Sequence, residues 1–352
     1  MDFQEIKRIY DAFEDTVSKR IFEKRILYSL SGDKKHIDSM VMEELNRLGS
    51  SDIMNRCIQW ITEKKIKEVS VFGAGFAGYM IVHVLKLFDI KVLKVYDNDL
   101  NKWGRYCNEV RIYSPSEIID DENIIIGVNN YCDDIYNQIT QNAKVRNIYK
   151  PDGAWWLGEY PQYFDRDIMS PSENEVFVDG GSLDGGDSIN FAKWCEYKYQ
   201  SIYAFEPDDK NVFKMERASE KIKNFNIYSV GMWSEKSTLR FSSGQSENCA
   251  ISEDGDVIVE VDSIDNILNG EAATFIKMDI EGSEFQALIG ARKTIKKYKP
   301  RLAICVYHKP EDIIDIPKKI LELNPNYKLW LRHYSYVDTE TVLYAVDGGK
   351  IL

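Results

Sequence analysis

A glycine-rich turn near the middle of the chain constrains the fold more than any other feature. The apolar run 176–178 ends in Asp179 and leads into a turn that contains Gly181 and Gly185. A buried parallel strand followed by such a turn and a helix brings the backbone close to a ligand. A second apolar run ends in Glu206, at the interval of about 20 residues expected between a nucleotide-binding loop and an acid that binds a ribose. This pattern predicts a cofactor that carries a nucleoside.

The spacing of this turn differs from the dinucleotide-binding pattern Gly-x-Gly-x-x-Gly. An acid precedes the first glycine, and three residues separate Gly181 from Gly185, which favours a cation-bearing ligand over a pyrophosphate. Two further motifs accompany it, Phe-Glu-Pro at 205–207 and Lys-Met-Asp-Ile-Glu-Gly-Ser-Glu at 277–284. With these motifs, residues 174–348 resemble the FkbM-type family of class I methyltransferases, which use S-adenosylmethionine.

The resemblance implies an α/β fold with a doubly wound class I methyltransferase sheet and S-adenosylmethionine as the cofactor. The segments 327–332 and 341–346 resemble the antiparallel hairpin that closes such a sheet, and the insertion 238–262 is expected to supply short strands outside it. Predicted strands and helices alternate after Glu206, and ligands of such a parallel sheet lie at the carboxyl ends of its strands. Residues of the loop and of these strand ends are the predicted cofactor contacts. They are Asp179, Gly181, Ser182, Gly185, Glu206, Pro207, Val230 and Gly231.

Three residues at the same strand ends are candidates for catalysis. Asp279 is the first candidate for a proton acceptor or an anchor of the methyl acceptor, and His308, one strand over, is the second. A positioned base adds about 100-fold to 10,000-fold to the rate of a reaction at a hydroxyl. Glu281 is expected to point toward the site, whereas Glu284 is expected to act only through the electrostatics of the following helix. Lys277 could pair with one of these two acids.

Asp279 also has an alternative role that involves no catalysis. Its carboxylate could hold the amino-acid portion of the cofactor or cap the helix that begins near Ser283. Asp279, Glu281 and Asp184 together offer several carboxylate oxygens to a divalent cation, but their spacing does not demand one. No metal site is therefore predicted.

The segment 68–150 has the pattern of a small Rossmann-like domain. A strand precedes a Gly-x-Gly-x-x-Gly turn with Gly73, Gly75 and Gly78, and the next strand ends in Asp97. This is the dinucleotide-binding fingerprint in its expected context of strand, turn and helix. The segment corresponds to about one mononucleotide half of a dinucleotide fold, so these glycines either bind a nucleotide or only permit close packing.

The predicted domain order has four parts. A helical segment at 1–67, suited to packing or dimerisation, precedes the Rossmann-like domain at 68–150. A connector at 151–173, rich in proline, glycine and tryptophan, leads to the methyltransferase domain at 174–352. The amino-terminal helices could support a homo-oligomer.

Composition limits the partners of the chain. The net charge is −12 and the pI is about 5.0, whereas a nucleic-acid partner requires a clustered basic face. We therefore expect no nucleic-acid partner.

The six cysteines include no Cys-x-x-Cys pair, so reduced thiols and no zinc site are expected. No apolar run approaches the roughly 20 residues that span a bilayer, and the polar first residues do not form a signal peptide. We expect a cytoplasmic protein without a membrane span.

These observations together predict methyl transfer from S-adenosylmethionine to a hydroxyl of a small molecule or glycan, which could be nucleotide-linked. Two alternatives stay open. One is a nucleotide or nucleotide-sugar binding protein without turnover, and the other is a nicotinamide-dependent oxidoreductase, which the absence of a second half-fold disfavours. The intact glycine loop and Glu206 favour an active enzyme.

Overall fold

The computed structural model describes residues 3–158, 162–218, 220–241 and 257–350. The chain forms two compact units. The larger unit contains Met1–Gly32, Tyr160–Arg332 and Glu340–Leu352, and the smaller unit contains Asp33–Glu159 and His333–Thr339. Among the described residues, no helix is long and apolar enough to cross a membrane.

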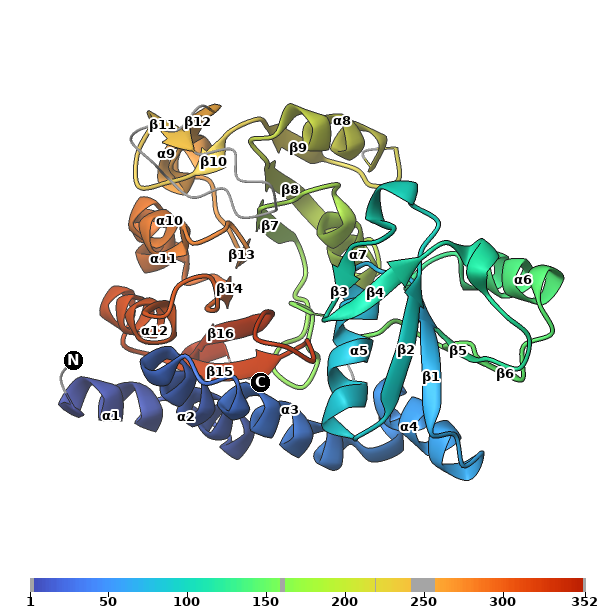
Figure 1. Cartoon of the computed structure of the whole chain (residues 1–352). Coiled ribbons are helices and arrows are strands. Elements are labelled where there is room, and N and C mark those ends of the chain that lie inside the picture. The colour runs from blue at the N-terminus through green and yellow to red at the C-terminus, as the bar shows by residue number, and fades with distance from the viewer. Residues whose placement is uncertain (1–2, 159–161, 219, 242–256, 351–352) are drawn as a thin grey trace. The chain divides into compact units, whose positions relative to one another are not determined.

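The smaller unit is built on a six-stranded sheet in the order β3-β4-β2-β1-β5-β6 (Figure 1). Its strands are β1 (Glu68–Phe72), β2 (Lys91–Tyr96), β3 (Tyr106–Cys107), β4 (Val110–Tyr113), β5 (Asn123–Ile126) and β6 (Asn147–Tyr149). Its helices are α3 (Lys35–Leu48), α4 (Ile53–Glu63), α5 (Phe76–Leu87) and α6 (Cys132–Asn142), with single turns η1 (Gly49–Ser51), η2 (Leu100–Lys102) and η3 (Pro115–Glu117). All paired strands are parallel except β3 and β4. Because β5 and β6 extend the sheet on the far side of β1, the unit exceeds the single half-fold expected from the sequence.

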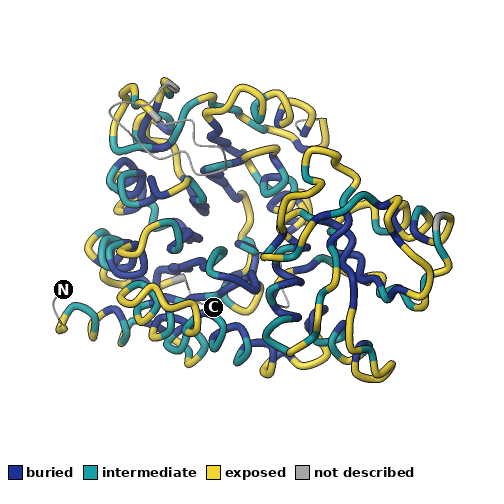
Figure 2. The backbone as a smooth tube through the Cα atoms, in the orientation of Figure 1, coloured by how far each residue is buried: buried dark blue, intermediate teal, exposed yellow. Residues whose placement is uncertain are grey.

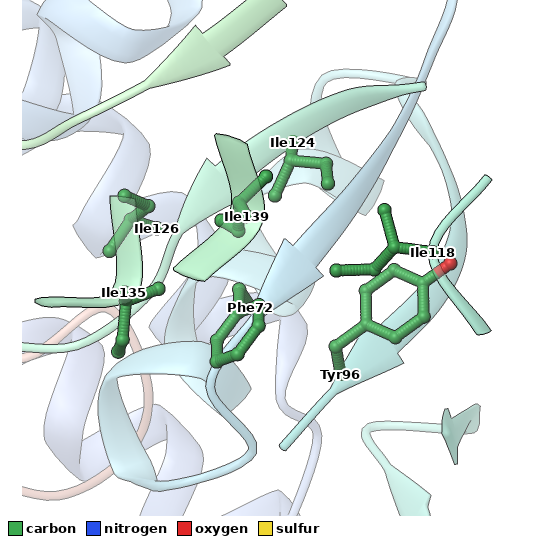
Figure 3. Packing of buried hydrophobic residues seen from close by; sticks show 7 residues of the cluster. All are labelled: Phe72, Tyr96, Ile118, Ile124, Ile126, Ile135 and Ile139. Carbon is green, nitrogen blue, oxygen red and sulfur yellow. The ribbon is translucent and has the colours of Figure 1, made fainter. Parts of the chain in front are cut away.

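Isoleucine side chains form much of the core of the smaller unit (Figure 3). Ile124 and Ile126 are two residues apart on β5 and therefore share one face of the sheet. Ile135 and Ile139 are four residues apart on α6 and share one face of that helix. The two pairs belong to one buried cluster with Phe72, Tyr96 and Ile118. The period of each element thus places α6 on the sheet.

The larger unit contains a seven-stranded sheet in the order β15-β16-β14-β13-β7-β8-β9. Its strands are β7 (Glu175–Gly180), β8 (Tyr199–Phe205), β9 (Phe225–Tyr228), β13 (Phe275–Met278), β14 (Arg301–Cys305), β15 (Tyr327–His333) and β16 (Thr341–Asp347). Strands β9, β8, β7, β13 and β14 are parallel, and β16 runs antiparallel to β14. The chain reverses its direction of winding between β7 and β13, and ligands of such sheets bind at this switch point. The fold is therefore the predicted doubly wound class I methyltransferase sheet.

The described helices of the larger unit pack on its sheets or on one another. They are α1 (Phe3–Asp11), α2 (Thr16–Ser31), α7 (Gly186–Trp194), α8 (Asp209–Ala218), α9 (Ile264–Leu268), α10 (Glu284–Gly290), α11 (Arg292–Tyr298) and α12 (Asp312–Leu323), followed by the turn η4 (Gly348–Lys350). Helices α10, α11 and α12 lie together on one side of the sheet and α7 lies on the other (Figure 1). Every residue of β7, β13 and β14 is consequently buried (Figure 2).

A small second sheet of the larger unit has the order β10-β12-β11. Its strands are β10 (Gly231–Met232), β11 (Ser237–Phe241) and β12 (Val257–Asp262). Strands β11 and β12 agree with the short strands expected in the insertion 238–262, whereas β10 precedes it. Residues 242–256 of the insertion lie outside the described residues.

The amino-terminal helices differ in two ways from the expected helical segment 1–67. First, α1 and α2 belong to the larger unit, whereas α3 and α4 belong to the smaller one, so the division falls at Gly32. Second, the apolar pattern runs on across a break between α1 and α2. There Phe13 forms a β-bridge with Leu329 of β15, and Asp15 caps α2 through the amide of Ser18. Pairing with a distant strand therefore ends α1, which local periodicity does not reveal.

Candidate active site

A buried ion-pair cluster holds the loop after β7. Lys277 of β13 is only 1% exposed, and its Nζ lies 3.2 Å from Oδ1 of Asp179 and 3.1 Å from Oδ2 of Asp187. The same ammonium group donates a 2.9 Å hydrogen bond to the carbonyl of Gly181. Burial alone would lower the pKa of Lys277, but the two carboxylates raise it, so the side chain stays charged. Burial also raises the pKa of Asp187 to about 6.

Asp179 and Ser182 shape the loop from within. The carboxylate of Asp179 is fully buried, and its Oδ2 accepts hydrogen bonds of 2.9 Å from Ser182 and 2.6 Å from Ser188. Asp179 and Ser182, both predicted to bind the cofactor, are thus hydrogen-bonded to each other. Leu183 lies at the exposed tip of the turn, with 58% of its surface exposed.

Gly181 and Gly185 are the two loop positions at which a side chain would not fit. Gly181 has φ +69, and a Cβ there would lie 1.8 Å from the carbonyl oxygen of Asp279. Gly185 has φ +81, and a Cβ there would lie 2.8 Å from the Cβ of Ala218. Both positions therefore require glycine for conformation and for space.

Glu206 contacts the glycine loop directly at the end of β8. Its Oε2 accepts a 3.0 Å hydrogen bond from the amide of Leu183, and its Oε1 accepts a 2.9 Å hydrogen bond from the amide of Asp208. Burial raises the pKa of Glu206, which is 7% exposed. Each carboxylate oxygen retains a further lone pair that could accept from a ribose hydroxyl.

The other predicted cofactor residues lie next to Glu206. Pro207 follows it and precedes α8, and the amide of Glu206 donates to the carbonyl of Tyr228 at the end of β9. Val230 is half-buried just after β9, and Gly231 begins β10. These residues therefore lie at the same edge of the sheet as the loop.

Asp279 lies at the end of β13, and both of its oxygens accept hydrogen bonds from tyrosines. Oδ2 accepts from the hydroxyl of Tyr163 at 2.7 Å, and Oδ1 accepts from that of Tyr307 at 3.2 Å. Burial would raise the pKa of Asp279, but the positive charges of Lys277 and His308 lower it. Asp279 is therefore a fixed negative charge and a weak base.

The structure brings His308 together with the two other predicted catalytic residues. Its Nε2 lies 3.4 Å from Oδ1 of Asp279 and 3.6 Å from Oε2 of Glu281. Its Nδ1 lies 2.9 Å from Oε1 of Glu284. Burial would lower the pKa of His308, but these carboxylates, Glu284 above all, raise it to about 9. The ring is therefore a poor proton acceptor near neutral pH.

Two expectations about neighbouring charges are corrected. Glu284 does more than support its helix, because its side chain is fully buried, faces His308 and accepts a 2.9 Å hydrogen bond from the amide of Ile280. Lys277 pairs with acids of the loop and α7 rather than with Glu281 or Glu284. In both cases the pairing depends on neighbouring strand ends, which sequence spacing does not specify.

Glu340 is a site residue that sequence reasoning missed. It immediately precedes β16, and its oxygens accept hydrogen bonds from Gln162 at 2.7 Å and from Tyr307 at 3.3 Å. Burial and the negative charge of Asp279 raise the pKa of Glu340 to about 7. It also has φ +63, which is uncommon for a non-glycine residue. A carboxylate with a pKa near neutrality at this edge is a candidate proton acceptor.

The glycines in the turn of the smaller unit differ in the space around them. A Cβ on Gly73 would lie 2.6 Å from the carbonyl of Gly127, and a Cβ on Gly78 would lie 1.9 Å from the carbonyl of Gly73. Gly75, in contrast, has no atom within 4 Å of such a Cβ. Gly73 and Gly78 are thus needed for packing between β1, α5 and β5, whereas the space beside Gly75 is open.

Asp97 follows β2, where a ribose-binding acid is expected. Its Oδ2 accepts a 2.7 Å hydrogen bond from the amide of Ala74 and lies 3.1 Å from Nζ of Lys102. Its Oδ1 accepts from the amide of Asp99 at 2.8 Å. The carboxylate thus ties the glycine turn to the end of β2.

Two protein families match this chain. Residues 179–337 match the family described as "Methyltransferase FkbM domain". Residues 65–148 match the family described as "C2185-like, N-terminal". A comparison with curated proteins gives no match.

Solved structures of methyltransferases are similar to this chain at low sequence identity. Methyltransferase FkbM from Methylobacillus flagellatus is 19% identical over 89% of this chain and 100% of its own, with a TM-score of 0.47. A putative methyltransferase from Streptococcus mutans, solved in complex with S-adenosylhomocysteine, is 14% identical over 52% of this chain and 93% of its own, with a TM-score of 0.33. Fibrillarin from Aeropyrum pernix, solved with S-adenosylmethionine, is 9% identical over 50% of this chain and 67% of its own, with a TM-score of 0.32.

Proposed function

Since residues 179–337 form a methyltransferase FkbM domain, we propose that this chain transfers the methyl group of S-adenosylmethionine to a hydroxyl oxygen of a small molecule or glycan. The observation that carries the proposal is the contact of the glycine loop with Glu206, at the sheet edge that also holds Asp279. Such an edge suits a cofactor whose ribose hydroxyls donate to Glu206 and whose remaining part follows the loop. The family supports S-adenosylmethionine as that cofactor.

The reaction is an in-line displacement at the methyl carbon. A bond forms between the acceptor oxygen and this carbon, the bond from carbon to sulfur breaks, and S-adenosylhomocysteine leaves as a neutral sulfide. Correct alignment of the two reactants supplies up to about 10 kcal/mol of the barrier reduction. The residues at the sheet edge are therefore needed mainly for position, and one of them must take the hydroxyl proton.

Glu340 is the best candidate for this proton acceptor. Its pKa of about 7 allows it to be ionised at neutral pH and still bind the proton as the acceptor oxygen reacts. The lowered pKa of Asp279 makes it a weaker base. We assign Asp279 to anchoring the acceptor, with Tyr163 and Tyr307 fixing its orientation.

A methyl-transfer screen tests the proposal. The purified full chain is incubated with S-adenosylmethionine that carries an isotopic methyl label and with a panel of sugars, glycosides, nucleotide-sugars, phenols, amines and thiols. The expected result is label in an alkali-stable ether of one hydroxyl compound. Label found only on nitrogen or sulfur acceptors, or turnover that Asp279→Asn leaves unchanged, would refute the assignment.

The smaller unit supports a second proposal, that it binds the nucleotide of a nucleotide-linked acceptor. The open space beside Gly75 would admit a phosphate near the start of α5. Phe76, Trp103 and Tyr131, which are 49%, 43% and 77% exposed, follow the carboxyl ends of three strands and offer stacking surfaces for a base. Nicotinamide dinucleotides belong in the same test, because the sheet exceeds a single half-fold.

Thermal unfolding of the full chain with nucleotides, nucleotide-sugars and NAD tests this second proposal. A ligand present at 100 times its Kd should stabilise the folded protein by about 2.7 kcal/mol. The shift should disappear in Gly75→Val, whose side chain would occupy the open space. If no ligand shifts the transition, the three glycines serve packing alone.

A further inference from the structure

The surroundings of His308 contain more carboxylates than one imidazole can balance. Asp279, Glu281 and Glu284 each have an oxygen within 3.6 Å of a ring nitrogen. Asp312 is also buried, and burial together with the negative charge of Glu284 raises its pKa to about 7. Lys277 also acts on Asp279, and Lys309 acts on Asp312. A histidine carries at most one positive charge, so repulsion among the remaining acids still favours an additional cation.

Several buried atoms of this cluster lack hydrogen-bond partners among the described residues. They are Oε2 of Glu284 and both ring nitrogens of His308. The side chain of Glu284 is 0% exposed and that of His308 is 9% exposed. The contact between Nδ1 and the Glu284 carboxylate is short at 2.9 Å but lacks hydrogen-bond geometry. Leaving a buried polar group unsatisfied costs about 1 to 3 kcal/mol, so such atoms usually have a partner.

We propose that Asp279, Glu284 and His308 bind a divalent cation, with Mn²⁺ as the best chemical match. One donor atom from each residue lies within 4.8 Å of the other two. Metal–ligand bonds of about 2.1 Å place neighbouring donor atoms about 3 Å apart and opposite donor atoms about 4.2 Å apart. The donor atoms of Asp279, Glu284 and His308 are close enough to one another to reach these separations. Two carboxylates with one imidazole suit Mn²⁺ better than Ca²⁺, which takes oxygen ligands, or a thiolate-preferring ion.

The groups around the three ligands are arranged as outer contacts of a metal site. Tyr163 and Tyr307 hold the Asp279 carboxylate in place. Such contacts fix the orientation of metal ligands.

A cation here would also narrow the class of acceptor, an extension that rests on the proposed function. Three protein ligands leave other coordination positions of an octahedral ion for water or for oxygens of the acceptor. Two adjacent hydroxyls, as in a sugar or a catechol, could occupy neighbouring positions. Coordination lowers the pKa of a bound hydroxyl and so favours its deprotonation before methyl transfer. A cation at this site would therefore favour a vicinal diol as the acceptor.

Metal binding is tested without a methyl donor. The full chain is stripped with EDTA and titrated with MnCl₂, and free Mn²⁺ is followed by electron paramagnetic resonance. The expected result is one bound ion per chain, with at least tenfold weaker binding in Glu284→Gln and in His308→Gln. Glu311→Gln, which removes an exposed carboxylate three residues after His308, serves as the matched control and should bind Mn²⁺ like the parent chain.

Two further measurements keep the result interpretable. The affinity of each variant for S-adenosylhomocysteine, measured without metal, reports whether the larger unit is folded. Methyl transfer to a vicinal diol should fall at least tenfold after EDTA and return with Mn²⁺. The metal site would be overturned if the parent chain bound none of Mn²⁺, Zn²⁺ and Mg²⁺. It would also be overturned if folded Glu284→Gln and His308→Gln bound Mn²⁺ as tightly as the parent chain. Intact methyl transfer in EDTA would overturn its role without affecting the proposed function.

Discussion

The hydroxyl of Tyr163 donates a 2.7 Å hydrogen bond to Oδ2 of Asp279, although the two residues are 116 positions apart in the sequence. Tyr163 is 3% exposed and belongs to the segment before β7. Its ring also lies 5.1 Å from Nζ of Lys277. A segment that resembled a connector in sequence thus supplies a side chain that orients the central carboxylate of the site.

Tyr163→Phe should lower kcat without weakening cofactor binding. The change removes one hydrogen bond to a charged group, which is worth about 1.5 to 3 kcal/mol, so kcat should fall about 10-fold to 150-fold. Steady-state kinetics and calorimetry with S-adenosylhomocysteine measure the two effects. Tyr199→Phe removes a hydroxyl that bonds to the carbonyl of Lys223 and is the control. Equal kcat in both variants would show that Asp279 needs no such orientation.

Glu340→Gln should change the pH dependence of turnover. Because Glu340 must be ionised to take a proton and its pKa is about 7, activity of the parent chain should rise as the pH increases through that value. The variant should lose this rise and at least 100-fold of its activity at pH 8. Glu322→Gln, on the exposed side of α12, should behave like the parent chain. If the activity of Glu340→Gln still rises with pH, another group takes the proton of the acceptor hydroxyl.

Lys277→Met should destabilise the larger unit strongly. It would leave the buried carboxylate of Asp179 and the partly exposed carboxylate of Asp187 without their cation, and breaking a buried ion pair in this way costs about 3 to 5 kcal/mol. Urea unfolding gives the free energy of unfolding for the variant and for Lys193→Met, an exposed lysine of α7. A loss below about 1 kcal/mol would mean that the cluster relaxes or takes up protons instead.

Gly181→Ala should weaken cofactor binding more than it lowers the stability of the larger unit. A Cβ at this position would lie 1.8 Å from the carbonyl of Asp279, so the loop must move away from β13. Affinity for S-adenosylhomocysteine should fall at least 100-fold. Gly153→Ala, whose Cβ would meet no atom within 4 Å, should leave the affinity unchanged. Tight binding by Gly181→Ala would place the cofactor away from this loop.

The sequence predicted the features that depend on local periodicity and on the ends of parallel strands. Apolar runs located β7, β8, β13 and β14, and the rule that ligands bind at their carboxyl ends brought Asp279 and His308 together. The same reasoning fails where an antiparallel strand contributes. Because β16 runs opposite to β14, its first residues lie at this same edge, and Glu340 precedes it directly. That inference was available from the expected hairpin.

Other parts of the site could not be predicted from one sequence. Lys277 could pair with any of several acids, and only the packed sheet selects Asp179 and Asp187. Glu284 faces His308 because its side chain is buried. An exposed glutamate in the first turn of a helix would only interact favourably with the helix dipole. The break between α1 and α2 likewise results from pairing with β15. Each of these outcomes follows from contacts between residues far apart in the chain.

The most direct test of the account is calorimetric titration of the full chain with S-adenosylhomocysteine, compared with Glu206→Gln. The parent protein should bind one molecule per chain. The variant should bind about 10-fold more weakly, because ribose hydroxyls would then donate to a neutral amide instead of a carboxylate. No binding by the parent chain, or affinities of the two proteins within twofold of each other, would contradict the assignment of the cofactor to the loop and Glu206.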